Sequence, residues 1–370
     1  MKIGCVKEIK KHEYRIGMTP DNVKAYVNRN HEVFIEKDGG LGSGFTNEQY
    51  AEAGAVILDT AAEVWAKSDM IIKVKEPLAE EYPLMREGQI LYTYLHLAAS
   101  EELTDACLKS GVKGVAYETI TDRNGALPLL KPMSEIAGRL SVQEGAKCLE
   151  KPMGGSGVLL SGIPGVPRAK VVVVGGGVVG TNAAKIAIGM GADVTIIDLS
   201  LDRLTYLDDL FGNAIKTVYS TDAAIEKEVA AADLVIGAVL VPGAAAPKLI
   251  KRKYFKNMRP GSVIVDIAVD QGGCCETTHA TYHDDPTFVV DGIVHYCVAN
   301  MPGATPRTAT LGLTNATLSR GLLIADKGLE AAAQLDSGIK KGINVYNGEL
   351  TCKEVAASFG RSHKDIDSLI

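Results

Sequence analysis

The chain has 370 residues, of which 46% are hydrophobic and 23% are charged, and its formal net charge is −6. This length predicts about two domains, and the composition is that of an ordinary globular protein rather than a disordered or fibrous one. The negative charge, without any run of lysine or arginine, excludes an electrostatic surface for nucleic acid.

The termini and the cysteines indicate where the protein works. The seven cysteines are scattered, with neither metal-ligand spacing nor a disulfide framework, which is typical of reduced thiols. The N-terminus is charged from its second residue and lacks an apolar core, so we expect no signal peptide. The longest apolar stretch, 171–197, is interrupted by glycines and charged residues and is no membrane span. We therefore expect a cytoplasmic protein without membrane contact.

The first third of the chain alternates short apolar runs with helix-like segments. Strands are predicted over 2–8, 31–37, 69–76, 88–97 and 112–119. Helices are predicted over 21–30, 46–55, 60–68 and 100–111, with Asp21, Thr46 and Ser100 as caps.

A long helix is predicted over 132–151, followed by a Gly- and Pro-rich loop over 152–169. The alternation then resumes, with strands predicted over 170–176, 193–198, 232–240, 262–270 and 287–298. The helical segment 305–335 reads as a return to the first domain. The pattern predicts an α/β protein with two Rossmann-like, doubly wound parallel-sheet domains around a central cleft, joined by long helices. The predicted domains are 1–130 with 306–370, for substrate, and 131–305, for a dinucleotide.

Residues 171–180 read VVVVGGGVVG, in which Gly175, Gly177 and Gly180 form a G-x-G-x-x-G after a strand. Gly175 permits a tight turn, Gly177 lets the backbone approach a pyrophosphate, and Gly180 lets the next helix pack against the sheet. The unpaired N–H groups at the start of that helix suit a diphosphate. Asp198 ends the next strand, where its carboxylate accepts bonds from ribose hydroxyls and repels a 2′-phosphate. The pattern predicts an NAD site; a ligand-free turn of a parallel sheet is the alternative.

Several polar residues follow predicted strands, where ligands of parallel sheets bind. His96 is the strongest general acid/base candidate, although a structural histidine fits the same position. Asp270 and Asp266 lie at even spacing on one predicted strand, and Asp270 fits an acid/base role or a helix cap. Lys75 shares a predicted strand face with Lys73, and we expect one of the two to point inward. Arg15 lies in a loop after the first strand and could grip a carboxylate or simply be exposed.

These segments resemble the L-alanine dehydrogenase family from end to end. The resemblance is carried by KEIKKHEYRIGMTP, KVKEP, YLHLAAS, KPMSEIAGRL, the glycine motif with its flanks, and VDIAVDQGGCCE. It implies two Rossmann-like domains, a homohexamer, and reversible NAD-dependent oxidative deamination of L-alanine to pyruvate and ammonium. It also implies that Arg15 and Lys75 bind the substrate and that His96 and Asp270 form the acid/base pair.

The resemblance further implies a set of NAD contacts, which are Ser134, Gly175, Gly177, Val178, Val179, Gly180, Asp198, Arg203, Ser220, Val239, Leu240, Ile267, Ala268, Val269, Asp270, Val298, Ala299, Asn300 and Met301. His279 stands where some members carry an arginine that touches the cofactor, so no contact is carried over there. Leu323 and Lys327 occupy a region where some members bind a divalent ion, so we expect no metal.

Three other functions remain open. The NAD-binding subunit of a proton-translocating transhydrogenase shares this architecture, although a hydrophobic C-terminal extension would be expected and this chain ends in polar residues. A related amino-acid dehydrogenase, such as a saccharopine-forming one, is disfavoured by YLHLAAS and KVKEP. A non-catalytic NAD sensor is disfavoured because Arg15, Lys75, His96 and Asp270 occur together.

Overall fold

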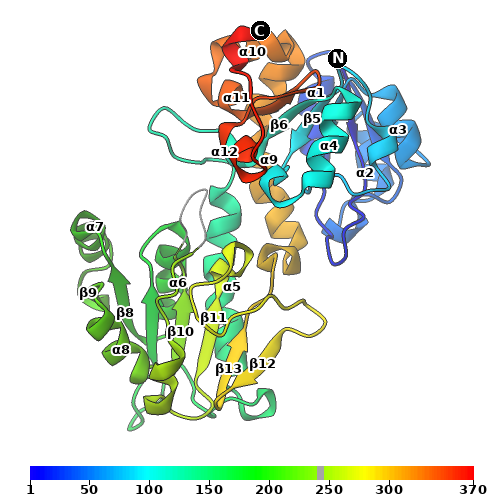
Figure 1. Cartoon of the computed structure of the whole chain (residues 1–370). Coiled ribbons are helices and arrows are strands. Elements are labelled where there is room, and N and C mark those ends of the chain that lie inside the picture. The colour runs from blue at the N-terminus through cyan, green and yellow to red at the C-terminus, as the bar shows by residue number, and fades with distance from the viewer. Residues whose placement is uncertain (240–245) are drawn as a thin grey trace. The chain divides into compact units, whose positions relative to one another are not determined.

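The computed structural model describes residues 1–239 and 246–370, and Leu240 and the 241–243 turn therefore lie outside the described residues. The chain divides into two compact units (Figure 1). Unit 1 comprises Met1–Met133 and Thr305–Ile370, and unit 2 comprises Ser134–Ala304.

Unit 1 contains an eight-stranded sheet in the order β15-β14-β6-β5-β4-β1-β2-β3. Its strands are β1 (Lys2–Cys5), β2 (Glu32–Glu36), β3 (Val56–Leu58), β4 (Met70–Ile72), β5 (Ile90–Thr93), β6 (Lys113–Ala116), β14 (Ile343–Tyr346) and β15 (Glu349–Leu350). Its helices are α1 (Pro20–Val27), α2 (Asn47–Glu52), α3 (Ala61–Lys67), α4 (Glu101–Ser110), α9 (Pro306–Lys327), α10 (Leu329–Leu335), α11 (Ser337–Gly342) and α12 (Lys353–Ser358).

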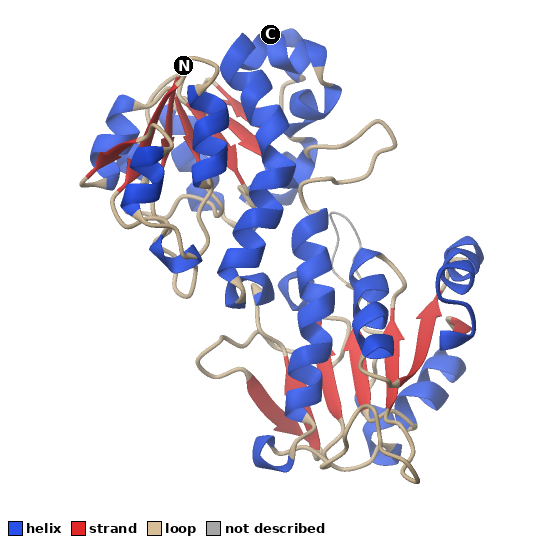
Figure 2. Ribbon diagram, turned by 180° about the vertical axis from the view of Figure 1, so that it is seen from behind, coloured by secondary structure: helices blue, strands red, loops and turns tan. Residues whose placement is uncertain are grey.

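Unit 2 contains a seven-stranded sheet in the order β12-β13-β11-β10-β7-β8-β9, whose strands lie side by side in Figure 2. Its strands are β7 (Lys170–Val174), β8 (Asp193–Asp198), β9 (Ile215–Tyr219), β10 (Leu234–Gly237), β11 (Val263–Asp266), β12 (Thr287–Val290) and β13 (Ile293–Tyr296). Its helices are α6 (Val178–Gly189), α7 (Leu201–Phe211), α8 (Asp222–Ala230) and most of α5 (Lys131–Cys148).

The two sheets share one topology. Each sheet contains six parallel strands. Their order across the sheet is β3-β2-β1-β4-β5-β6 in unit 1 and β9-β8-β7-β10-β11-β13 in unit 2, so both follow the chain order third, second, first, fourth, fifth, sixth. This doubly wound order places the first and fourth strands side by side, where the winding reverses and where ligands of such sheets bind. The prediction of two Rossmann-like α/β folds is confirmed, while the predicted cleft stays a prediction.

Both sheets are mixed at one edge, where purely parallel sheets were predicted. In unit 2, the predicted single strand over 287–298 is wrong, because β12 and β13 form an antiparallel hairpin. Asp291 and Gly292 occupy its turn with φ of 50° and 80°, which is the backbone that a two-residue hairpin turn requires. In unit 1, β14 pairs antiparallel with β6 and β15.

Three predicted boundaries also change. The helix predicted over 305–335 is broken at Gly328, whose φ of 81° separates α9 from α10. The cap of α1 is Thr19 rather than Asp21, because Pro20 begins the helix and the Thr19 hydroxyl accepts the Asn22 N–H. The strand predicted over 262–270 ends at Asp266, and residues Ile267–Gln271 form a 3₁₀ turn.

Alternating strand residues build an apolar core on each face of each sheet. In β7, Val171 and Val173 pack on one face while Val172 and Val174 pack on the other, as the two-residue period of a strand requires. All seven cysteines are buried free thiols, and burial raises the pKa of each one. Within the described residues, no helix has the length and apolarity to cross a membrane.

Candidate functional site

The glycine turn of unit 2 leaves the end of β7 and leads into α6. Gly175 has φ of +101°, which favours glycine. A Cβ on Gly180 would lie 1.8 Å from the Gly175 carbonyl oxygen, so only glycine lets α6 pack this close. A Cβ on Gly177, by contrast, would meet no atom within 4 Å. The Gly177 backbone is exposed at the start of a 12-residue helix that has no side-chain cap. These features fit a dinucleotide pyrophosphate.

Asp198 and Arg203 fix the middle of this turn. The Asp198 carboxylate accepts the Gly176 N–H through Oδ2 (2.7 Å) and the Ser200 N–H through Oδ1 (2.8 Å). The Arg203 guanidinium donates to the Gly176 carbonyl oxygen and to the Thr181 hydroxyl. A carboxylate offers about four acceptor positions, so Asp198 retains acceptor capacity for ribose hydroxyls while it holds the turn.

The other predicted cofactor residues of unit 2 lie at the same edge of the sheet. Ser220 follows β9, Val239 follows β10, the 267–270 segment follows β11, and the 298–301 segment follows β13. Because these strands are parallel, their carboxyl ends meet at one edge. Val178, Val179 and Gly180 form the first turn of α6, and Ser134 lies near the start of α5. The sheet thus gathers the residues that follow its strands, and the contacts of all the predicted residues with a cofactor stay predictions.

Asp270 is exposed in the 3₁₀ turn after β11, and Asp266 is fully buried beneath it. The predicted placement of both carboxylates on one strand face is wrong, because the strand ends at Asp266. The Asp266 carboxylate accepts the N–H groups of Ala268 (3.1 Å) and Cys275 (3.0 Å) and the Thr278 hydroxyl (2.6 Å). Asp266 therefore holds the turn that presents Asp270.

His279, for which no cofactor contact was carried over, is exposed and stacks on Phe288 with ring centroids 3.8 Å apart.

In unit 1, Arg15 is buried beside Glu13 after β1. Its side chain is 2% exposed, and its Nε and Nη2 donate to Glu13 Oε1 (2.6 Å) and Oε2 (2.5 Å). Its Nη1 lies 3.0 Å from the Met133 sulfur. The alternative of a simply exposed arginine is therefore wrong. A planar guanidinium held on one edge by a carboxylate is well oriented to meet a second one.

Lys73 points inward, as expected of one of the two lysines, but the predicted strand face shared by Lys73 and Lys75 is wrong, because β4 ends at Ile72. Lys73 is fully buried between Glu8 (3.2 Å) and Glu81 (2.8 Å). Burial alone would lower the Lys73 pKa, but the two carboxylates outweigh it and raise that pKa. Glu8 also accepts the N–H groups of Val74 (2.6 Å) and Lys75 (3.2 Å), so the cluster fixes the backbone that carries Lys75.

The Lys75 side chain is half-buried at the same strand end. Burial and then the positive charge of Arg15 lower the pKa of Lys75. Two cations are thus held close enough to influence each other, which suits a shared anionic ligand.

His96 lies between β5 and the Ser100-capped α4, as predicted, with φ of 48° and ψ of 35°. This left-handed backbone is costly for a residue with a Cβ and is often found at functional sites. The Glu118 carboxylate accepts the N–H groups of Leu95 (3.1 Å) and His96 (2.6 Å) and so maintains it. The imidazole stacks on Tyr94 (5.8 Å between centroids), and its Nδ1 lies 3.2 Å from Glu76 Oε2.

Sequence reasoning missed four of these carboxylates, namely Glu8, Glu13, Glu81 and Glu118. Glu8 and Glu118 follow β1 and β6, so their positions after strands were the available signal. Their roles depend on backbone groups 66 and 22 residues away, respectively, which no local pattern reveals.

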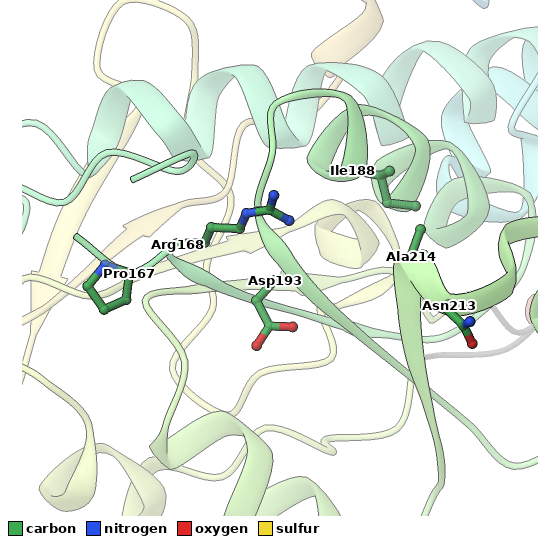
Figure 3. A pocket seen from close by; sticks show the side chains of 7 residues that line it. Pro167, Arg168, Ile188, Asp193, Asn213 and Ala214 are labelled. Carbon is green, nitrogen blue, oxygen red and sulfur yellow. The ribbon is translucent and has the colours of Figure 1, made fainter. Parts of the chain in front are cut away.

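A hollow of unit 2 lies away from the predicted cofactor residues (Figure 3). It has a volume of about 410 Å³ and is lined by Pro167, Arg168, Ile188, Ala192, Asp193, Asn213 and Ala214. Most of these residues adjoin the amino ends of β7, β8 and β9, opposite the edge that carries the glycine turn. Across residues 1–239 and 246–370, no three His, Cys, Asp or Glu side chains are arranged to hold a metal ion.

Comparison with known proteins matches the chain from end to end. Residues 4–137 match the N-terminal domain of the alanine dehydrogenase/PNT family, and residues 141–353 match its C-terminal domain. The alanine dehydrogenase of Halomonas elongata is 53% identical over 370 residues, which is 100% of both chains. A solved L-alanine dehydrogenase has a TM-score of 0.95 at 52% identity, covering 97% of this chain and 99% of that one. A transhydrogenase from Sinorhizobium meliloti has a TM-score of 0.82 at 25% identity, covering 95% and 99%.

Proposed function

The chain belongs to the alanine dehydrogenase/PNT family, and from that premise we propose how its own residues carry out the reaction. It is an oxidoreductase that catalyses the reversible oxidative deamination of L-alanine to pyruvate and ammonium. Its likeness over the full length to alanine dehydrogenases is the observation that carries this function.

The cofactor is NAD rather than NADP. The residues around the glycine turn would hold NAD, which would supply a hydride acceptor for the alanine Cα. The support in this chain is the glycine turn, which leads into a helix without a side-chain cap, and the Asp198 carboxylate, which is held 2.7 Å from the Gly176 nitrogen. A carboxylate at the ribose position accepts hydroxyl bonds and repels a 2′-phosphate.

Arg15 and Lys75 bind the carboxylate of alanine and, in the reverse reaction, the carboxylate and the oxo group of pyruvate. The guanidinium offers a planar, pre-oriented pair of donors, and the half-buried ammonium adds a second positive charge. Both groups hold the alanine in one orientation, which lowers the entropic part of the barrier. A small pocket discriminates against one extra methylene by only about 1–3 kcal/mol, so slow turnover of 2-aminobutyrate is expected.

His96 and Asp270 move protons. Alanine reacts after its ammonium group has released a proton to solvent, so loss of the hydride from Cα leaves an iminium ion that water attacks. His96 removes a proton from that water and returns it as the carbinolamine releases ammonium. Asp270 orients the amino group and the water. The strained backbone of His96 and the exposure of Asp270 on its held turn support these roles.

The assembly is a homohexamer that works in the cytoplasm. This part of the proposal rests on membership of the family, with the helices of the C-terminal region burying contacts between subunits. Light scattering at micromolar concentration should report about six times the 39.2 kDa chain mass. A monomer under those conditions would refute the assembly.

One assay tests the function and its alternative together. NAD reduction is measured with L-alanine, 2-aminobutyrate, serine, lysine and glutamate, and each reaction is repeated with NADP. Turnover should be highest with alanine and NAD. The likeness to a transhydrogenase makes hydride exchange between nicotinamide dinucleotides the second candidate. Hydride exchange between two nicotinamide dinucleotides, without any NAD reduction by alanine, would establish that candidate instead.

A further inference from the structure

Glu76 contacts the imidazole of His96 from a different strand end. The Glu76 carboxylate follows β4, and its Oε2 lies 3.2 Å from His96 Nδ1. Its other oxygen, Oε1, accepts a hydrogen bond from the ammonium group of Lys10. Glu76 is largely buried, with 15% of its side chain exposed, whereas 43% of the His96 side chain and 42% of the Lys10 side chain are exposed.

The contact defines which imidazole nitrogen carries a proton. Burial alone would raise the pKa of Glu76, but the hydrogen bonds from His96 and Lys10 outweigh it and hold that pKa well below the usual range. Glu76 is therefore ionised at neutral pH and can only accept a hydrogen bond. Nδ1 must then donate, which leaves Nε2 as the nitrogen that gains and loses a proton.

The surroundings of His96 make Glu76 the side chain that controls the imidazole. Five titratable or charged groups surround it, which are Glu76 at Nδ1, Glu118 at the backbone N–H, the Tyr94 ring stacked on it, and Lys10 and Lys75, whose positive charges act on Glu76. Glu118 and Tyr94 fix the backbone and the ring plane. Only Glu76 accepts from a ring nitrogen among these contacts, so it alone selects the tautomer.

We propose that Glu76 is a positioning residue that holds His96 in its Nδ1–H tautomer and increases the proton affinity of Nε2, with Lys10 weakening that increase. An anion hydrogen-bonded to one imidazole nitrogen orients the ring and stabilises its protonated form, as in other carboxylate–histidine pairs. The proposal rests on the proposed function, in which His96 is the catalytic base.

Two variants of opposite sign test the proposal. Glu76→Gln keeps an acceptor of similar shape but removes the charge, and it should move the acidic limb of kcat/KM by about one pH unit or more. Lys10→Met removes the cation that offsets Glu76, and it should move that limb in the opposite direction by about half a pH unit. Because the base must be unprotonated for deamination, the acidic limb of kcat/KM should move to lower pH in the first variant and to higher pH in the second.

The measurements are the pH profile of kcat/KM for L-alanine and the titration of the His96 ring signal by NMR in the full-length protein, assigned with His96→Ala. Glu80→Gln is the matched control, because Glu80 is an exposed carboxylate of the same loop, and it should leave both values in place. Glu76→Asp retains the charge and should restore the acidic limb to within a few tenths of a unit.

The outcomes separate this proposal from the function on which it rests. If His96→Ala loses activity but Glu76→Gln moves neither the limb nor the NMR titration, Glu76 is a structural ion pair and the proposal is wrong. If His96→Ala keeps its activity, the assignment of the base fails by itself. Should Glu76→Gln not fold, the surface variant Lys10→Met decides, and an unmoved titration there overturns the proposal.

Discussion

The sheets of units 1 and 2 have the same strand order, but different groups lie where the first and fourth strands are neighbours and the strand order reverses. In unit 2 the first strand ends in a glycine turn, which offers backbone N–H groups and a helix start. In unit 1 the first and fourth strands end in buried charges, with Glu8 paired to Lys73 and Arg15 paired to Glu13. Both arrangements can bind an anion. The difference shows that the strand order determines where a ligand binds, whereas the residues at the strand ends determine whether backbone or side-chain groups bind it.

The largest expected effect is loss of stability in unit 1 when its buried charges are broken. Lys73→Met leaves Glu8 and Glu81 buried without their cation, so the free energy of unfolding should fall by about 3–5 kcal/mol. Urea unfolding measures this change. Lys216→Met is the control in unit 2, because the Lys216–Asp193 pair is exposed, and such pairs contribute about 0–1 kcal/mol. Equal losses in both variants would contradict the contrast.

The next effect falls on turnover and involves one residue from each unit. His96→Ala and Asp270→Asn should each lower kcat at least about a hundredfold, the low end of general acid–base contributions. NAD affinity should hardly change for His96→Ala and should weaken somewhat for Asp270→Asn. Measuring kcat, NAD dissociation and melting temperature on the same preparations checks this. A folded His96→Ala within a few-fold of the parent would end the assignment.

Binding through the backbone in unit 2 is tested by Gly177→Ala. A Cβ there meets no protein atom within 4 Å, so the melting temperature should hardly move. The new Cβ would lie against the pyrophosphate and displace it from a backbone N–H group. Loss of one hydrogen bond to a charged group costs about 1.5–3 kcal/mol, so NAD binding should weaken about tenfold or more. Unchanged NAD affinity by calorimetry would show that the turn does not hold the cofactor. Gly180→Ala is the contrasting variant, because its Cβ clashes with the Gly175 carbonyl and should lower the melting temperature.

Asp198→Gly should relax the choice of cofactor. It removes the carboxylate that opposes a 2′-phosphate and leaves Arg203 beside the turn, so the preference for NAD over NADP should fall about tenfold. The ratio of kcat/KM values for the two cofactors measures the preference. A parent enzyme that already uses both cofactors equally would refute the role of Asp198.

The smallest effect is on pH dependence in unit 1. Burial and the charge of Arg15 lower the pKa of Lys75 below its ordinary 10.5, so the ammonium loses its proton at a lower pH than an exposed lysine does. The KM for pyruvate should therefore rise several-fold with pH in the alkaline range. Lys75→Arg keeps its charge there and should flatten the rise. If the KM for pyruvate rises equally in the parent and in Lys75→Arg, the rise is caused by a group other than Lys75.

The sequence predicted more of unit 2 than of unit 1. A strand followed by glycines and a distant acid is a local pattern, and the turn at Gly175 and the position of Asp198 follow from it. The hairpin turn at Asp291 was missed because the apolar residues on both sides of the Asp-Gly pair were interpreted as one strand. In unit 1, Glu8 could not be assigned, because its partners Val74 and Lys75 meet it only after the sheet has formed.

The buried thiols allow the local opening of each unit to be measured separately by the rate of thiol labelling. Cys5, Cys107 and Cys352 belong to unit 1, and Cys148, Cys274, Cys275 and Cys297 belong to unit 2. A maleimide can reach them only when the surrounding segment opens, so the labelling rate reports the free energy of local opening. Peptide mapping after timed labelling would resolve the two sheets without any introduced probe. Ligands that tighten one sheet would slow its own cysteines first.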